Sequence, residues 1–242
     1  MIGWRARLGF LVPPGNPTVE PEMIALAPAG VSLHFHRMDA GGGVPGALDN
    51  QDARTRAMVD SLDAAVPLLA SVKPDIITIA HTATSYYLGR EREATLLARL
   101  SEMGGTRVIA AFGSVAAALE RLGVRRVALG APYSAETTAQ GKAHLEAHGF
   151  TVTRAENLKG VTNIYDETAE RAYRLARGVD TPEAEAVFLT GTGMPTLPVL
   201  DMLEQDLGKP VISSASAMMW HALRRCGVRQ PIPGFGKLLT LD

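Results

Sequence analysis

Polar and titratable residues follow several apolar runs of this chain, at the points where buried β-strands would end. Asn16 comes after one run, His81 and Thr82 after a second, and Tyr133 after a third. Histidine titrates near neutral pH, so His81 could be a general acid or base, or a hydrogen-bonded histidine of the core. Amide and phenol groups are hydrogen-bond donors that suit a carboxylate. The pattern indicates a site that binds a small anion and moves a proton.

Two turns combine small residues with hydroxyl side chains, namely Thr82–Ser85 and Gly191–Gly193. Backbone N–H groups at the start of a helix form a ready anion site. Threonine and serine also cap helices without any ligand, and this is the simpler interpretation of either turn alone. Several such turns around one point would instead favour a carboxylate site.

The segments between these residues predict a parallel α/β fold, because short apolar runs alternate with longer amphipathic stretches. We expect helices at Gln51–Val72 and Ser214–Cys226, a helix from an N-cap at Ser114 to Leu122, and a glycine-rich loop at Asp39–Asp49. The expected strands are Arg7–Val12, Val31–Arg37, Asp75–Ala80, Arg107–Ala110, Arg126–Gly130, Thr151–Ala155, Ala186–Thr190 and Pro210–Ser213.

The chain contains an internal repeat. "LGFLVPPGN" (Leu8–Asn16) resembles "VALGAPYS" (Val127–Ser134), and "KPDIITIAHTATSYYLG" (Lys73–Gly89) resembles "PEAEAVFLTGTGMPTL" (Pro182–Leu197). The alternative is that any two strand–helix units look alike. Ligands of open parallel sheets bind beyond the carboxyl ends of the strands. We therefore expect two similar four-stranded halves with one site between them, the first formed by residues 1–112 with 215–242 and the second by 113–214.

Composition excludes several classes of protein. The formal net charge of −1 gives no attraction to nucleic acid or to an anionic membrane surface, and no stretch predicts a signal peptide or membrane span. Cys226 is the one cysteine, which excludes an intramolecular disulfide and suits the cytoplasm. His144 and His148 lack a third metal ligand, and phosphate-binding glycine loops are missing. We expect no cofactor, no metal, no nucleic acid and no membrane partner, whereas a homo-oligomer stays open.

Four ordered motifs carry a family resemblance: "LVPPGNPTVEPEM", "DIITIAHTATSYYLG", "RRVALGAPYS" and "AVFLTGTGMPTLPVLDMLEQDLGKPVISS". Over essentially its whole length the chain resembles the maleate cis-trans isomerases and arylmalonate decarboxylases of the aspartate/glutamate racemase superfamily. The resemblance implies the two-half α/β fold with its active site at the interface. It also implies a substrate-binding role for Asn163 in "GVTNIYDE".

The chain departs from this family where the family places its thiols. By the resemblance, racemases and maleate isomerases carry a cysteine in each half, and arylmalonate decarboxylases keep the second. His81 stands at the first position and Gly191 at the second. A racemase needs a base on each face of the substrate carbon, and Gly191 has no side chain to serve as one. Decarboxylation needs donors that stabilise an enediolate, an apolar pocket that destabilises the departing carboxylate, and one acid that protonates the carbanion.

We therefore expect a cofactor-independent decarboxylase of a small malonate-like or other dicarboxylic acid. His81 would be the acid/base and Tyr133 a catalytic donor, while the substrate would be bound by Asn16, Thr82, Ala83, Asn163, Gly191, Thr192 and Gly193. One alternative is a cis-trans isomerase or tautomerase that moves a proton with His81. The alternative from a different class is a non-catalytic carboxylate-binding protein.

Overall fold

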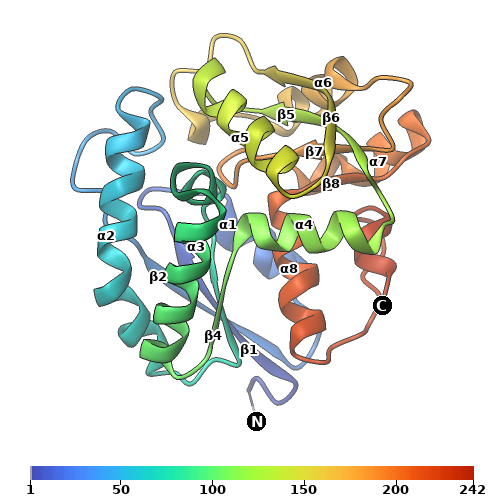
Figure 1. Cartoon of the computed structure of the whole chain (residues 1–242). Coiled ribbons are helices and arrows are strands. Elements are labelled where there is room, and N and C mark those ends of the chain that lie inside the picture. Colours follow the sequence, from blue (N-terminus) through green and yellow to red (C-terminus); the bar gives the residue numbers. More distant parts are fainter. Residues whose placement is uncertain (1) are drawn as a thin grey trace.

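Parallel strands form two four-stranded sheets in the computed structural model, which describes residues 2–242 (Figure 1). The first sheet has the order β2-β1-β3-β4 and the second the order β6-β5-β7-β8. Because the order is the same within each half, β1 corresponds to β5 and β3 to β7. This confirms the expected fold class and the pairing of the repeated segments. The strands are β1 (Ala6–Val12), β2 (Val31–Arg37), β3 (Ile76–Ile79), β4 (Arg107–Ala110), β5 (Arg126–Ala131), β6 (Thr151–Asn157), β7 (Ala186–Leu189) and β8 (Val211–Ser213).

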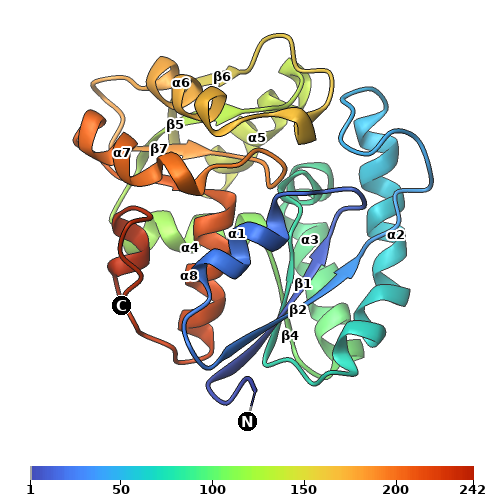
Figure 2. The ribbon, with the colours of Figure 1, turned by 180° about the vertical axis from the view of Figure 1, so that it is seen from behind.

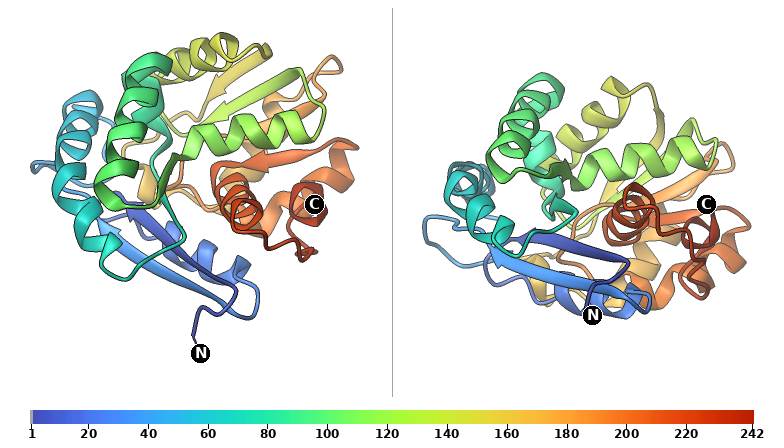
Figure 3. Two further views of the ribbon diagram at one scale, coloured as in Figure 1. Left: turned by 60° about the horizontal axis from the view of Figure 1, so that its bottom comes forward. Right: turned by 90° about the horizontal axis from the view of Figure 1, so that it is seen from below.

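Helices cover both sheets and fill the space between the halves. The helices are α1 (Val19–Leu26), α2 (Gln51–Ala70), α3 (Thr82–Gly104), α4 (Ala111–Arg121), α5 (Ala135–Ala147), α6 (Ala169–Val179), α7 (Leu197–Leu207) and α8 (Ser214–Arg225). In the first half, α2 and α3 lie side by side, and α4 packs against α8 in the middle of the molecule, between the two sheets (Figure 3). Seen from behind, α1 lies against α8 (Figure 2). Among the helices of residues 2–242, none is long and apolar enough to span a membrane.

The core explains why the strands could be recognised from sequence. The central strands β3 and β7 are buried along their whole length, as expected for continuous apolar runs in a parallel sheet. One large apolar cluster runs through both halves, and a smaller one lies between α2, α3 and the first sheet. The shared cluster holds the strand ends of the two halves in one fixed arrangement. The domain boundaries given above stay a prediction.

All of the expected strands are present, with ends that move by two residues or fewer. The predicted N-cap at Ser114 was wrong, because α4 begins at Ala111, directly after β4. Ala110 has the extended backbone of an N-cap, with φ −95° and ψ 153°, and the Ser114 hydroxyl donates to the Ala110 carbonyl at 3.2 Å from inside the helix. Helix α1 was not predicted, because it is short and contains Pro21. The expected loop at Asp39–Asp49 is present between β2 and α2.

Candidate active site

The carboxyl ends of four strands meet at the border of the two halves. The Thr192 hydroxyl, after β7, donates to the Ala80 carbonyl after β3 at 2.9 Å, and the Asn16 amide after β1 donates to the Thr192 carbonyl at 3.2 Å. The Tyr133 hydroxyl, after β5, lies 3.2 Å from the point where a β-carbon on Gly191 would sit. The residues singled out from sequence therefore gather where the topology of a doubly wound sheet places a ligand.

The turn after β3 opens helix α3 with free backbone donors. His81 is the N-cap, in an extended conformation, and its side chain caps none of the backbone N–H groups of the helix. The N–H groups of Thr82 and Ala83 lie in the first turn, where a helix offers them no internal acceptor. The Thr82 hydroxyl donates to the Ser214 hydroxyl at 2.9 Å, which fixes its direction. This helix start therefore presents donors and a positive dipole end to an anion.

His81 is a buried imidazole at this turn, with 7% of its surface exposed. Its Nδ1 lies 2.9 Å from the Thr84 hydroxyl, which orients the ring. Burial, followed by the nearby charge of Arg54, lowers the pKa of His81 to about 4. The imidazole is therefore neutral at pH 7, and a bound anion would raise its pKa.

Tyr133 supplies a phenol that stays protonated. It is 1% exposed, and burial raises its pKa well above the ordinary value of 10, although the Thr82 and Thr190 side chains partly oppose this by favouring the ionised form. The Thr190 hydroxyl is also 2.7 Å from the Tyr86 hydroxyl, which reaches it from α3 in the other half. Sequence reasoning missed Tyr86, although its spacing of one helical turn from Thr82 was a usable signal.

The turn after β7 requires glycine twice. Gly191 has φ +92°, a region that side chains rarely adopt, and a β-carbon there would lie 2.9 Å from Pro132 Cγ. A β-carbon on Gly193 would lie 2.7 Å from the Tyr165 ring. The backbone of this turn therefore approaches its neighbours more closely than any other residue type would allow.

The expectation that this second turn opens a helix directly was wrong, because α7 begins only at Leu197. Pro195 disfavours helical backbone at the residue before it, which delays the helix. The start of α7 is also occupied, since Glu22 Oε1 accepts from the N–H groups of Thr196 at 2.6 Å and Leu197 at 2.9 Å. Of these two turns, the one after β3 thus offers a free helix N-terminus to a ligand.

The Asp39–Asp49 loop and residues 163–165 contact each other beside the turns after β1 and β7, and together they form a cover over the site. The Asn163 amide donates to the Pro45 carbonyl at 2.9 Å, and its oxygen accepts from the Tyr165 N–H at 2.9 Å. Tyr165 lies against Gly193, and burial raises the pKa of its phenol to about 12. Sequence reasoning missed Tyr165, two residues from Asn163. The structure joins Asn163 to the loop, and its direct contact with a substrate stays a prediction.

Asn16 connects the two halves through its own side chain. Its oxygen accepts from the N–H groups of Thr18 at 2.9 Å and Val19 at 3.1 Å, at the start of α1. Its nitrogen donates to Thr192, as described above. Asn16 therefore positions the β7 turn in this structure, and substrate binding by its amide stays a prediction.

Comparison with known proteins agrees with this geometry. Residues 8–239 match the family model described as arylmalonate decarboxylase. The chain belongs to the arylmalonate decarboxylase family. The maleate isomerase of Nocardia farcinica is 31% identical over 249 residues, which cover 98% of this chain and 96% of that protein. The arylmalonate decarboxylase of Bordetella bronchiseptica is 29% identical over 169 residues, which cover 67% and 70%.

Solved structures show the same fold as this family member. The Nocardia farcinica maleate cis-trans isomerase, as a cysteine-to-serine mutant with a covalently bound succinylcysteine intermediate, matches with a TM-score of 0.88 at 28% identity over 98% of this chain and 99% of that one. A crystal structure of arylmalonate decarboxylase matches with a TM-score of 0.81 at 23% identity, over 98% and 100%. The chain is thus an enzyme of a family that contains isomerases and lyases.

This arylmalonate decarboxylase family member has no thiol at its strand ends. Cys226 is its one cysteine and lies at the C-terminal end of α8, where burial raises its pKa to about 11. His144 and His148 pack against Phe112, with ring centroids 4.4 Å and 5.0 Å from it. No group of three potential metal ligands occurs in the described part of the chain.

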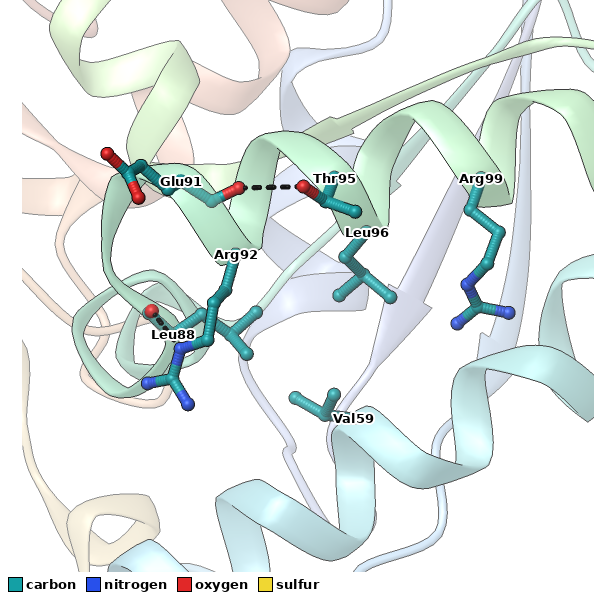
Figure 4. Close-up of a pocket in the computed structure, with 7 residues that line it drawn as sticks. All are labelled: Val59, Leu88, Glu91, Arg92, Thr95, Leu96 and Arg99. Carbon is teal, nitrogen blue, oxygen red and sulfur yellow. Dashed lines mark hydrogen bonds between the residues drawn. The ribbon is translucent and has the colours of Figure 1, made fainter.

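A surface hollow of about 460 Å³ lies elsewhere in this family member, between α2 and α3 (Figure 4). Its arginines already have partners. Arg99 pairs with Asp63 at 2.8 Å, and Arg92 donates to carbonyls of its own helix. The lining contains none of the strand-end residues.

Proposed function

We propose that this protein is a cofactor-independent decarboxylase of a small malonate-like dicarboxylic acid. The observation that carries the proposal is the hydrogen bond between the Tyr133 hydroxyl and the Thr82 side chain at the start of α3, next to the neutral imidazole of His81 and without a thiol among them. Donors of this kind stabilise the negative charge that develops on a carboxylate oxygen when an enediolate forms. A nucleophile is not needed for that reaction.

In the proposed reaction the carbon–carbon bond to one carboxylate breaks and CO₂ leaves. The electron pair of that bond enters the retained carboxylate, which becomes an enediolate held by Tyr133 and by the N–H groups of Thr82 and Ala83. Protonation of the α-carbon by His81 then gives the monocarboxylic acid, and His81 regains its proton from solvent. The departing carboxylate would face the apolar cover formed by Pro45, Ile164 and Tyr165. An apolar surrounding destabilises a carboxylate relative to neutral CO₂.

Substrate binding would also prepare His81 for its role. Before a substrate binds, the imidazole is neutral because burial lowers its pKa to about 4. A dianion bound beside it favours the protonated form and raises this pKa. We therefore propose that the protein takes up a proton as the dicarboxylate binds, so that an acid is present only when there is a carbanion to protonate.

A cis-trans isomerase is the second candidate, favoured by the full-length similarity to a maleate isomerase. Without a cysteine at the site, isomerisation would depend on the imidazole of His81 as nucleophile. The third candidate is a protein that binds a carboxylate and does not turn it over.

Incubation with malonates, substituted malonates and maleate in D₂O, followed by proton NMR and CO₂ detection, separates these candidates. The proposal predicts loss of one carboxylate and one deuterium at the α-carbon of the product. Fumarate from maleate without CO₂ would establish the isomerase instead. Binding without turnover of any acid would leave the non-catalytic candidate.

A further inference from the structure

The Thr84 hydroxyl has an unusual partner for a threonine inside a helix. Such hydroxyls commonly donate to the carbonyl four residues earlier, and Thr95 of the same helix does so to Glu91 at 3.1 Å. Thr84 is 1% exposed, and its one side-chain hydrogen bond within residues 2–242 is with Nδ1 of His81 at 2.9 Å. The carbonyl four residues before it, that of Ala80, accepts from the Thr192 hydroxyl. The Thr84 hydroxyl therefore serves the imidazole and not the helix.

The spacing of His81 and Thr84 brings their side chains together at the start of α3. His81 is the N-cap and Thr84 follows three residues later, and residues three apart are neighbours on a helix surface. The Thr84 N–H also donates to the His81 carbonyl at 3.3 Å. These two bonds fix the imidazole relative to the helix start, where the N–H groups of Thr82 and Ala83 hold the retained carboxylate in the proposed reaction.

The two ring nitrogens of His81 have different surroundings. Nδ1 faces the Thr84 hydroxyl. Nε2 forms no hydrogen bond within residues 2–242, and it is not one of the fully enclosed atoms without a partner in that range. Nε2 is therefore the nitrogen that a substrate or solvent can reach. The hydrogen bond made by one nitrogen of a histidine decides the role of the other.

We infer that Thr84 is the positioning residue of the acid/base: it holds Nδ1 of His81 in both protonation states of the ring, so that Nε2 is the atom that transfers the proton. This inference rests on the proposed function. A hydroxyl both donates and accepts, so the same side chain can bind a neutral imidazole and an imidazolium in turn.

The direction of the hydrogen bond follows from the protonation state of the ring. In the neutral ring the hydroxyl donates to Nδ1, because it has no other acceptor within residues 2–242 and an unpaired buried hydroxyl is unfavourable. The ring proton is then on Nε2. When the ring takes up a second proton on substrate binding, Nδ1–H donates to the Thr84 oxygen. The carbanion receives the proton of Nε2, the electron pair of that N–H bond stays on Nε2, and a proton from solvent replaces the one transferred.

Nitrogen NMR of protein labelled with ¹⁵N at its histidines detects the ring protons directly and needs no substrate. The chain has six histidines, and the signals of His81 are those that His81→Ala lacks. At pH 7 the neutral ring of the wild type should carry its proton on Nε2. Thr84→Val keeps the shape of the side chain and removes the hydroxyl, so it should show both tautomers, whereas Thr84→Ser should show the wild-type tautomer. A proton on Nδ1 in the wild type would overturn the inference without any variant of Thr84.

Kinetics and proton uptake test the role in the reaction. Thr84→Val should lower kcat for malonate by about tenfold to a hundredfold, the scale of a lost hydrogen bond to a charged group, because the imidazolium loses the acceptor of Nδ1–H. KM should change much less, since the donors of Thr82, Ala83 and Tyr133 are kept. Proton uptake on malonate binding, measured by calorimetry in two buffers of different ionisation enthalpy, should decrease. Thr84→Ser should restore both quantities, and the control Thr95→Val, which changes an exposed threonine of the same helix, should match the wild type.

The outcomes separate this inference from the proposed function. If malonate is decarboxylated and Thr84→Val keeps the tautomer, proton uptake and kcat of the wild type, only this inference fails. A lower Tm of Thr84→Val with an unchanged tautomer would also overturn it, because Thr84 would then be a residue of the core. If the wild type releases no CO₂ from any malonate, the proposed function fails, and the NMR spectra still decide whether Thr84 sets the tautomer of His81.

Discussion

At the scale of single residues, the site depends on where a proton can be held. The neutral His81 lies on the first turn, and the second turn carries Gly191 with φ +92°. A side chain at position 191 would be strained by this backbone and would press on Pro132 and the Tyr133 hydroxyl. The geometry thus suits a glycine at the place where the family resemblance puts a thiol. Proton transfer would come from the first half of the molecule.

His81→Ala should reduce kcat to background and leave the affinity for a dicarboxylate largely unchanged, because the anion donors belong to Thr82, Ala83 and Tyr133. Rates are measured by CO₂ release and affinities by calorimetry. His144→Phe is the matched control, since it removes another buried histidine whose pKa is lowered to about 4 but which packs in an aromatic cluster. Full activity of His81→Ala would make His81 a histidine of the core.

At the scale of elements, the part of α3 before Gly89 is set apart from the rest of the helix and contributes to the site. Gly89 interrupts the helix with φ 69° and ψ 166°, and the buried Glu93 accepts a hydrogen bond from Ser85 across this interruption. The segment before Gly89 carries Tyr86, which contacts Thr190 after β7. A helix start from one half is thereby held against a strand end of the other.

Tyr133→Phe should lower kcat by roughly tenfold to a thousandfold, the scale for removing one preorganised donor. Tyr86→Phe should lower kcat by a smaller factor without raising KM, because Tyr86 positions Thr190 and touches no substrate in the proposed reaction. Steady-state kinetics of both variants are compared with Tyr173→Phe, whose native hydroxyl donates to Asp206 away from the site. An unchanged kcat in Tyr133→Phe would remove that phenol from the mechanism.

At the scale of the whole molecule, buried polar contacts join the two halves around the site. Thr192 bonds to the Ala80 carbonyl, Asn16 bonds to Thr192, and Glu22 of α1 caps the start of α7. Glu22 is the titratable member of this set. Burial raises its pKa from 4.5 to about 7, although hydrogen bonds from Leu197 and Thr196 act in the opposite direction.

Glu22→Gln should stabilise the protein increasingly as pH rises from 5 to 8. The folded protein holds a proton on Glu22 up to about pH 7, whereas the unfolded chain releases it near 4.5, so the stability that this group contributes is lost as pH rises through 7. The shift corresponds to roughly 3 kcal/mol as an upper bound. Glutamine can still accept the two N–H bonds and does not ionise.

The difference in Tm between Glu22→Gln and the wild type, measured at several pH values, checks this expectation. Glu185→Gln is the control. The pKa of Glu185 is lowered by the N–H groups of Arg125 and Arg126, so that group titrates below the tested range. A Tm difference that stays constant between pH 5 and 8 would contradict the assigned titration of Glu22.

The sequence by itself determined the strands, the two-half topology and the residues at the strand ends. Buried parallel strands are short continuous apolar runs, and the residue that follows each run is placed by local chain geometry alone. Asn16, His81, Tyr133 and Gly191 could be singled out for that reason. The helix start at Ala111 was not predicted, because its N-cap, Ala110, is the last residue of β4 and has no capping side chain.

Only the tertiary structure decided which partners these residues have. Tyr86 and Tyr165 join the site from distant segments, and the contact of Glu22 with the start of α7 spans 174 residues. The low pKa of His81 is mainly a consequence of its burial in the folded protein, which no local pattern expresses. Side chains that are far apart in the chain meet through packing of the shared core, so their contacts depend on the whole fold.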